Sequence, residues 1–187
     1  MDALGKMRIK KLNVVLDEDY RNILTEEFSR SYAEVDNLGR PENIVKVMKE
    51  MFHLSEKAEE YVYLICMTSG CRPVGFFEVA HGTHNGALTG IREIFVRALL
   101  CGAAGIVLVH NHPGGIPDPS EEDICVTDKI RAASEFMGIR FFDHIIISQT
   151  SWFSFEKEGK LEKQEWGSIS ARFREILKNL SDGKKSA

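Results

Sequence analysis

The sequence lacks the features that mark secreted and membrane-spanning proteins. Its longest apolar runs are no longer than a β-strand, and residues 1–20 contain no stretch suited to a signal peptide or a membrane span. Only four cysteines occur, and no two of them have the C-x-x-C spacing of a cysteine-based zinc site. We therefore expect reduced thiols, no membrane association and a cytoplasmic protein.

The sequence also lacks an excess of positive charge. Its 24 Lys and Arg residues are outnumbered by 28 Asp and Glu residues, which gives a formal net charge of -4. Proteins that depend on nucleic acid as a partner usually carry a basic surface, so this balance argues against such a partner. A local basic cluster near the start of the chain leaves two interpretations open, a solvated terminus or a small nucleic-acid-binding patch. Its members are Lys6, Arg8, Lys10 and Lys11.

The chain is long enough for one ordinary domain with short flanking segments. Its hydrophobic share of 43% and charged share of 28% are typical of a globular protein. We divide it into an N-terminal extension over residues 1–40, a main domain over 41–160 and a C-terminal helix and tail over 161–187. Within the extension, residues 6–16 are predicted to form a strand and residues 17–32 a short helix.

The main domain mixes helical and strand patterns. A helix is predicted from Pro41, because proline is favoured in the first turn and apolar residues follow at helical spacing. The other predicted elements are strands 61–67 and 74–82, helix 91–102, strand 105–112, helix 120–138, strand 143–148 and an edge strand from residue 152. This order predicts an α/β fold, a three-layer α/β/α domain with a mixed central sheet. An amphipathic helix over 168–180 is expected to pack on this domain or to support a homodimer.

The stretch VHNHPGGIPDPSEED (109–123) carries the strongest candidate site. His110 and His112 end a predicted strand two residues apart, so both imidazoles face the same side. A loop rich in proline and glycine follows, and Ser120 then begins a helix whose first turn contains Asp123. Two histidines and one carboxylate fit a catalytic zinc site, because they leave one position open for water. Taken separately, the pieces have simpler interpretations, a helix cap and two loop histidines.

The pattern His-x-His, seven residues, Ser-x-x-Asp in residues 110–123 resembles the signature of the JAMM (JAB1/MPN/Mov34) metalloproteases. The surrounding HNHPGG and PDPSEEDI sequences, Thr127 and the FFDHIII segment (141–147) are similar to the RadC branch of that family. The resemblance covers residues 41–160. It implies a JAB1/MPN-like domain and Zn2+ as the cofactor.

The resemblance also implies how the site would work. Zinc would be held by His110, His112 and Asp123, while Ser120 would hydrogen-bond the oxyanion or the attacking water. An amide is a poor electrophile and neutral water is a poor nucleophile, and zinc helps by lowering the pKa of its bound water to about 7. A hydroxyl donor aimed at the oxyanion contributes a few kcal/mol, on the order of an oxyanion-hole donor.

A glutamate at the start of an early strand acts as general base and then acid in this family. Glu60, which precedes the predicted strand 61–67, is the residue that we assign to this role. Glu59 and Glu78 stay open as alternatives. Asp143 and His144, which also fit the RadC branch, are interpreted as a structural pair at a strand start and not as ligands.

We predict a zinc-dependent hydrolase, a metallopeptidase or isopeptidase that cleaves an amide bond in a protein or peptide substrate. Two alternatives stay open: a DNA-associated RadC-type protein with a repair or nuclease role, and a non-catalytic interaction scaffold. RadC-type chains usually carry a helix-hairpin-helix segment associated with DNA contact, and residues 1–40 show no paired hairpin glycines. Scaffolds in this family often lose the metal ligands, whereas the full set is present here, and this favours an enzyme.

Overall fold

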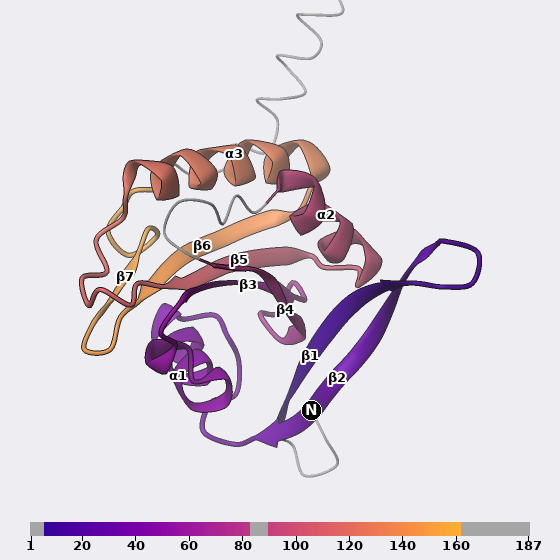
Figure 1. The fold of residues 1–187 in the computed structure, drawn as a ribbon, viewed down its shortest axis with the longest axis horizontal. Helices are drawn as coiled ribbons and strands as arrows, with labels where there is room; N and C mark the ends of the chain where they lie inside the picture. Colours follow the sequence, from indigo (N-terminus) through magenta and orange to yellow (C-terminus); the bar gives the residue numbers. More distant parts are fainter. Residues whose placement is uncertain (1–5, 83–89, 162–187) are drawn as a thin grey trace, which may run out of the picture.

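The computed structural model describes residues 6–82 and 90–161. One seven-stranded sheet runs through this part of the chain, in the order β2-β1-β4-β3-β5-β6-β7 (Figure 1). The strands are β1 (Met7–Leu16), β2 (Asn22–Tyr32), β3 (Glu60–Met67), β4 (Pro73–Gly82), β5 (Gly105–Asn111), β6 (Arg140–Ile147) and β7 (Trp152–Ser154). β1 pairs in parallel with β4, and β5 with β6, while the other neighbours are antiparallel. The sheet is therefore mixed, as the sequence predicts.

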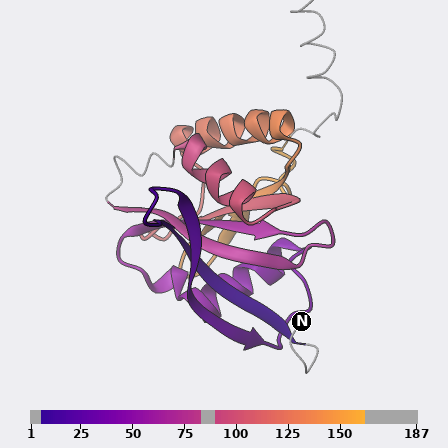
Figure 2. The same ribbon diagram turned by 90° about the vertical axis from the view of Figure 1, so that its right-hand side faces the viewer.

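Helices cover both faces of this sheet. They are α1 (Pro41–Phe52), the short 3-10 helix η1 (Leu54–Glu56), α2 (Ile91–Leu100) and α3 (Glu121–Met137). α2 and α3 lie over one face and α1 lies over the opposite face (Figures 1 and 2). The predicted three-layer α/β/α architecture is thus confirmed.

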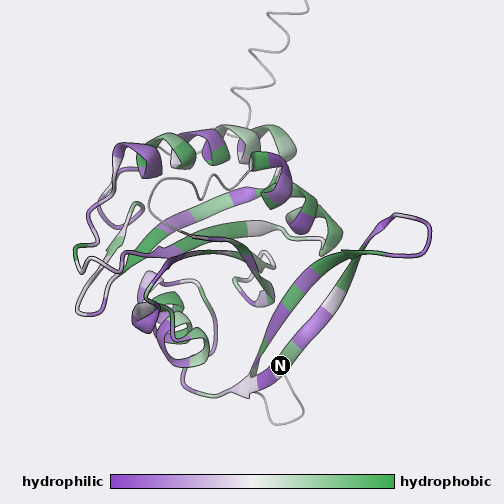
Figure 3. Ribbon diagram, viewed as in Figure 1, coloured by the Kyte–Doolittle hydropathy of each residue, from purple (hydrophilic) through white to green (hydrophobic). Residues whose placement is uncertain are grey.

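Two apolar cores fill the spaces between the layers. One holds α1 against the sheet through residues such as Met48 and Ile65, and the other holds α2 and α3 through residues such as Ile94 and Ile130. β5 contributes to both cores, and all seven of its residues are buried. A strand covered on both faces is expected to be almost continuously apolar, and β5 is hydrophobic along most of its length (Figure 3). The polar residues at the end of β5, His110 and Asn111, are therefore buried as well.

The helix boundaries follow the signals in the sequence. Pro41 occupies the first turn of α1, where its missing N–H costs no hydrogen bond. Ser120 caps the start of α3, and Gly138 ends it in the left-handed conformation, with a φ of 68°. These caps fix the first turn of α3 next to the end of β5, which is where the candidate ligands lie.

The helix predicted over residues 17–32 is wrong, because residues 22–32 form β2. Leu24, Phe28 and Tyr32 recur every four residues, a spacing that fits one face of a helix as well as alternate positions of a strand. A bulge opposite the Lys11–Leu12 step shifts the pairing of β2 with β1. As a result Leu24 packs against the core under α2 and α3, while Phe28 packs against the core under α1. The pairing of β2 with β1 decided this segment, which local spacing alone could not.

The N-terminal hairpin joins the sheet of the main domain. β1 pairs with β4, with Lys11 opposite Phe76. Two members of the basic cluster are neutralised in the hairpin: Lys10 pairs with Glu26 at 3.0 Å, and Lys11 pairs with Glu27 at 3.0 Å. A lysine that is already paired with a carboxylate contributes less to phosphate binding than an unpaired lysine does.

Three further predictions concern the C-terminal helix, the cysteines and membrane-spanning segments. The helix over 168–180, and the dimer that it would support, lie outside the described residues. All four cysteines are free thiols, as predicted. Among residues 6–82 and 90–161, no helix is long and apolar enough to cross a membrane.

Candidate metal centre

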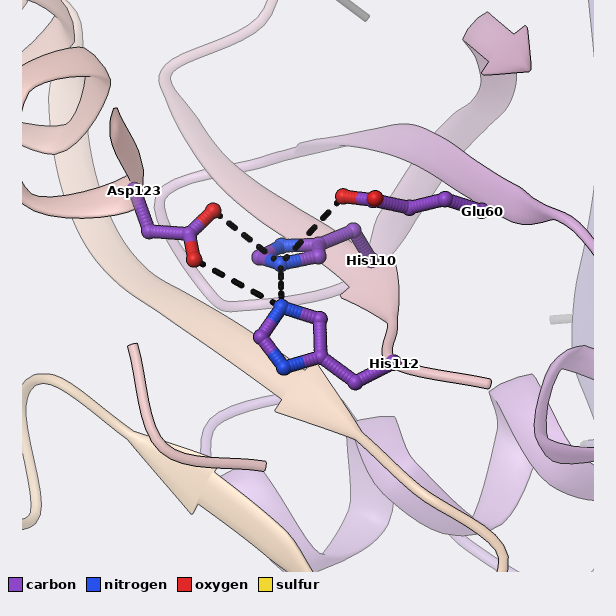
Figure 4. A group of neighbouring side chains, drawn as sticks. All are labelled: Glu60, His110, His112 and Asp123. Atoms are coloured by element: carbon purple, nitrogen blue, oxygen red, sulfur yellow. Dashed lines mark hydrogen bonds and ion pairs between the residues drawn. The ribbon is translucent and has the colours of Figure 1, made fainter. Parts of the chain in front are cut away.

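Two histidine side chains meet at the end of β5. His110 lies within the strand, between Val62 of β3 and Ile146 of β6, and His112 follows the last strand residue. Their Nε2 atoms are 3.0 Å apart (Figure 4). The alternation of a strand explains why both rings face one side, as the sequence predicts.

Asp123 approaches these rings from the first turn of α3. Its Oδ1 lies 3.2 Å from Nε2 of His110, and its Oδ2 lies 3.5 Å from Nε2 of His112. Ser120 holds the carboxylate in place: its backbone N–H and its hydroxyl donate to Oδ2, at 2.8 and 2.7 Å. The helix cap and the candidate ligand are thus one arrangement, since the cap orients the carboxylate.

Ser120 therefore performs the simpler of its two predicted tasks in this structure. Its hydroxyl hydrogen is directed at Asp123 Oδ2, and its oxygen accepts the backbone N–H of Asp123 at 3.1 Å. The catalytic role that the resemblance implies for Ser120 stays a prediction, and it requires the hydroxyl to turn away from the carboxylate.

Glu60 completes the group from the opposite side. It is the first residue of β3, and its Oε1 lies 3.8 Å from Nε2 of His110. One donor atom from each of the four residues lies within 4.8 Å of the others (Figure 4). Nitrogen and carboxylate oxygen donors that converge in this way can hold a metal ion.

The two alternative glutamates are placed differently. The carboxylate of Glu78, on β4, lies 3.4 Å from Nζ of Lys11, 3.2 Å from the hydroxyl of Tyr63 and 3.0 Å from Nδ1 of His81. Glu78 is not among the four converging residues. Glu59 directly precedes Glu60 but is likewise absent from the group. Of the three glutamates, Glu60 is the one whose carboxylate belongs to the group around His110 and His112.

The side chain of Asn111 fixes the backbone on both sides of Glu60. Its Oδ1 accepts the N–H of Tyr61 at 2.8 Å, and its Nδ2 donates to the carbonyl of Glu59 at 3.0 Å. Asn111 is buried, with 2% of its surface exposed, and the amide takes the place of a strand peptide where β3 and β5 separate. Nothing in the sequence pattern singled out Asn111, because its partners are about fifty residues away.

The side chains of Asp143 and His144, interpreted from the sequence as a structural pair, contact different neighbours. Asp143 accepts hydrogen bonds from Ser154 Oγ and from the N–H of Glu156, and burial raises the pKa of its carboxyl to about 6. His144 instead lies behind His110, with its Nε2 2.8 Å from His110 Nδ1. Neighbouring strand residues face opposite sides, so the two side chains serve separate contacts. Both residues are buried and neither belongs to the converging group, and their structural role stays a prediction.

The electrostatics of the group favour a cation. Burial acts to raise the pKa of Asp123, but the imidazoles of His110 and His112, which in their protonated form donate from Nε2 to the carboxylate, outweigh it and hold the pKa well below its ordinary value. The hydrogen bond with Asp123 raises the pKa of His112. Nδ1 of His112 lies 2.9 Å from the carbonyl of Ile116, which can only accept a hydrogen. In the neutral ring the hydrogen is therefore on Nδ1 and the lone pair is on Nε2. The donor set therefore fits a divalent metal ion.

Residues 38–161 match the model of the RadC-like JAB domain. The chain belongs to this family. The match contains all four residues of the converging group. In this JAB domain the converging residues thus come from the start of β3, the end of β5 with the residue that follows it, and the first turn of α3.

Relatives of this JAB domain protein occur in several bacteria. The UPF0758 protein of Thermotoga maritima is 31% identical over 161 residues, which are 86% of this chain and 69% of that protein. UPF0758 proteins of Pelobacter propionicus and Actinobacillus pleuropneumoniae serotype 5b are 38% and 36% identical, over 59% and 66% of this chain and 48% and 55% of their own length. The chain therefore spans only about half the length of two of these three relatives.

Proposed function

We propose that this JAB domain is a zinc-dependent hydrolase, a metallopeptidase or isopeptidase that cleaves an amide bond in a protein or peptide. The observation that carries the proposal is the convergence of Glu60, His110, His112 and Asp123 within 4.8 Å. Two imidazole nitrogens and one carboxylate are a common zinc ligand set in hydrolases. The four free thiols suit the reducing cytoplasm in which we place the protein.

His110, His112 and Asp123 would hold the zinc. When bound, zinc supplies Lewis acidity that lowers the pKa of a coordinated water into the neutral range. Asp123 contributes a carboxylate that is already ionised, and the cap at Ser120 keeps it turned toward the histidines. The two Nε2 atoms face the same point because β5 and the following loop fix both rings.

Glu60 would move the proton. Its carboxylate is largely buried and its Oε1 lies 3.8 Å from His110 Nε2, so it borders the metal position. In this position it would take a proton from the nucleophile and return it to the leaving amine, as a general base and then a general acid. Asn111 supports this role, since it holds the strand on both sides of Glu60.

Two variants separate the metal site from the catalytic group. Glu60→Gln removes the base and keeps the size of the side chain, so zinc content is expected to persist while turnover falls by about 10²- to 10⁴-fold. Glu59→Gln is the matched control, because Glu59 lies one residue away and outside the group. This variant is expected to keep both its zinc content and its turnover. Zinc is measured by elemental analysis, and turnover with a fluorogenic peptide library and a lysine-linked isopeptide.

The double variant His110→Ala plus His112→Ala tests the site itself. About one zinc per chain is expected in the native protein and none in the variant. A folded native protein that binds no zinc when zinc is supplied would overturn the proposal and favour a scaffold. Cleavage of DNA but not of peptides by the zinc-loaded protein would assign the site to a nuclease instead.

A further inference from the structure

A chain of hydrogen bonds runs behind His110, on the side away from the metal position. The Oγ1 of Thr127 lies 2.6 Å from the backbone carbonyl of Asp123 and 2.6 Å from Nδ1 of His144. Nε2 of His144 then lies 2.8 Å from Nδ1 of His110. All four residues are buried, so water does not compete for these bonds.

The chemistry of these groups fixes where each hydrogen sits. A backbone carbonyl can only accept, so the single hydroxyl hydrogen of Thr127 points at Asp123. The hydroxyl oxygen must then accept from His144, which places a hydrogen on Nδ1 of that ring. A neutral His144 has no second hydrogen, and its Nε2 accepts from Nδ1 of His110. His110 is left with a bare Nε2 that faces Asp123 and His112.

The surroundings of His144 keep its ring neutral. The ring is fully buried and stacks on Phe155, with 5.1 Å between the centroids and 6° between the planes. Its two nitrogens contact Thr127 and His110, and neither of these partners is a carboxylate that would stabilise an imidazolium. The hydrogen positions assigned above therefore apply to every bond from the Asp123 carbonyl to His110.

We propose that Thr127 and His144 are positioning residues that select the Nδ1–H tautomer of His110 and so create its metal-binding Nε2. The inference rests on the proposed metal-binding function. The chain starts at the backbone of Asp123 and ends at the ring of His110, so it ties a ligand on α3 to a ligand on β5. We call this row of hydrogen bonds the relay. His112 does not depend on it, because the carbonyl of Ile116 sets the tautomer of His112. Residues behind a ligand commonly change metal affinity by 10- to 100-fold.

Thr127→Val is the decisive variant, because valine keeps the branched shape and removes the hydroxyl. Without the acceptor, His144 is free to carry its hydrogen on Nε2 and to donate to His110. His110 would then carry its hydrogen on Nε2, where it blocks the metal. Thr127→Ser restores the hydroxyl and is expected to restore the native behaviour.

Ser134→Ala is the matched control. Ser134 lies on the same helix, is fully buried, and among the described residues its hydroxyl has no hydrogen-bond partner. Loss of this hydroxyl changes the buried surface of α3 but leaves the relay intact. It is expected to change neither the tautomer of His110 nor the affinity for zinc.

Two measurements test the proposal. The tautomers are determined by NMR on metal-free protein with ¹⁵N-labelled histidine, at a pH of about 9, above the ordinary imidazole pKa of about 6.5. Zinc affinity is measured by competition with a chromophoric chelator. We expect Nδ1–H for His110 and His144 in the native protein, a changed His110 tautomer in Thr127→Val, and a 10- to 100-fold loss of zinc affinity that Thr127→Ser reverses.

The outcomes separate this proposal from the proposed function. A native His110 with its hydrogen on Nε2, or a Thr127→Val protein with native tautomer and native zinc affinity, would overturn the relay. An equal loss of affinity in Ser134→Ala would also overturn it, by showing a general loss of packing. The expected tautomers and affinities in a protein that cleaves no peptide would support the relay and count against the peptidase.

Discussion

Replacing Asn111 by alanine tests how the strand that carries Glu60 is held. The variant leaves the N–H of Tyr61 and the carbonyl of Glu59 without their partner. A buried group that loses its hydrogen bond costs about 1–3 kcal/mol. The contact lies partly at the surface, so the lower end applies to each group, and the free energy of unfolding should fall by about 2 kcal/mol. For a chain of this length that lowers the melting temperature by about 4–8 °C.

Urea and thermal unfolding of the metal-free protein measure this loss. Asn13→Ala is the matched control, because Asn13 hydrogen-bonds Glu27 at an exposed position and its loss should change stability by about 0.5 kcal/mol or less. The Asn111 variant should still bind zinc, since its amide is not a ligand, but should lose turnover as Glu60 moves. Equal stability of the two variants would refute the reasoning, as would a loss of zinc together with native stability.

Three further predictions concern the ligands and their cap. Asp123→Asn removes the anionic oxygen, so elemental analysis should find little zinc in it, and unchanged zinc content would remove Asp123 from the ligand set. The raised pKa of His112 adds stability to the metal-free protein below the unfolded value of about 6.5, and urea unfolding should show this stability lost as the pH rises through the folded pKa. A His112→Ala protein with the same pH dependence would contradict this. Ser120→Ala removes the cap of α3 and should cost about 1 kcal/mol in thermal unfolding, and a native melting temperature would show that the cap is dispensable.

The candidate ligands were predictable because their signals are local. His110 and His112 are two residues apart in a strand, and Asp123 follows a cap residue at the start of a helix. Strand alternation and helix capping act over two to four residues, so the sequence carries them in full. Local signals gave the wrong prediction for residues 22–32, because a four-residue apolar spacing fits a helix and a strand equally well.

The residues that support the site were not predictable in the same way. Asn111 contacts residues 57–61, and His144 contacts His110 across a strand pair that 34 residues of chain connect. Their roles depend on which strands are neighbours and in which register. Neither property follows from a periodic pattern in one sequence.

By itself, the sequence determined the layered α/β fold, the candidate ligand types and their common side of the sheet, because hydrophobic periodicity and capping are set by neighbouring residues. The tertiary structure alone decided that Glu60 and not Glu78 lies beside His110, that residues 22–32 form a strand, and that Thr127 and His144 stand behind His110. These facts arise from the pairing of β1 with β2, the pairing of β3, β5 and β6, and the docking of α3, which depend on contacts that local sequence patterns do not encode.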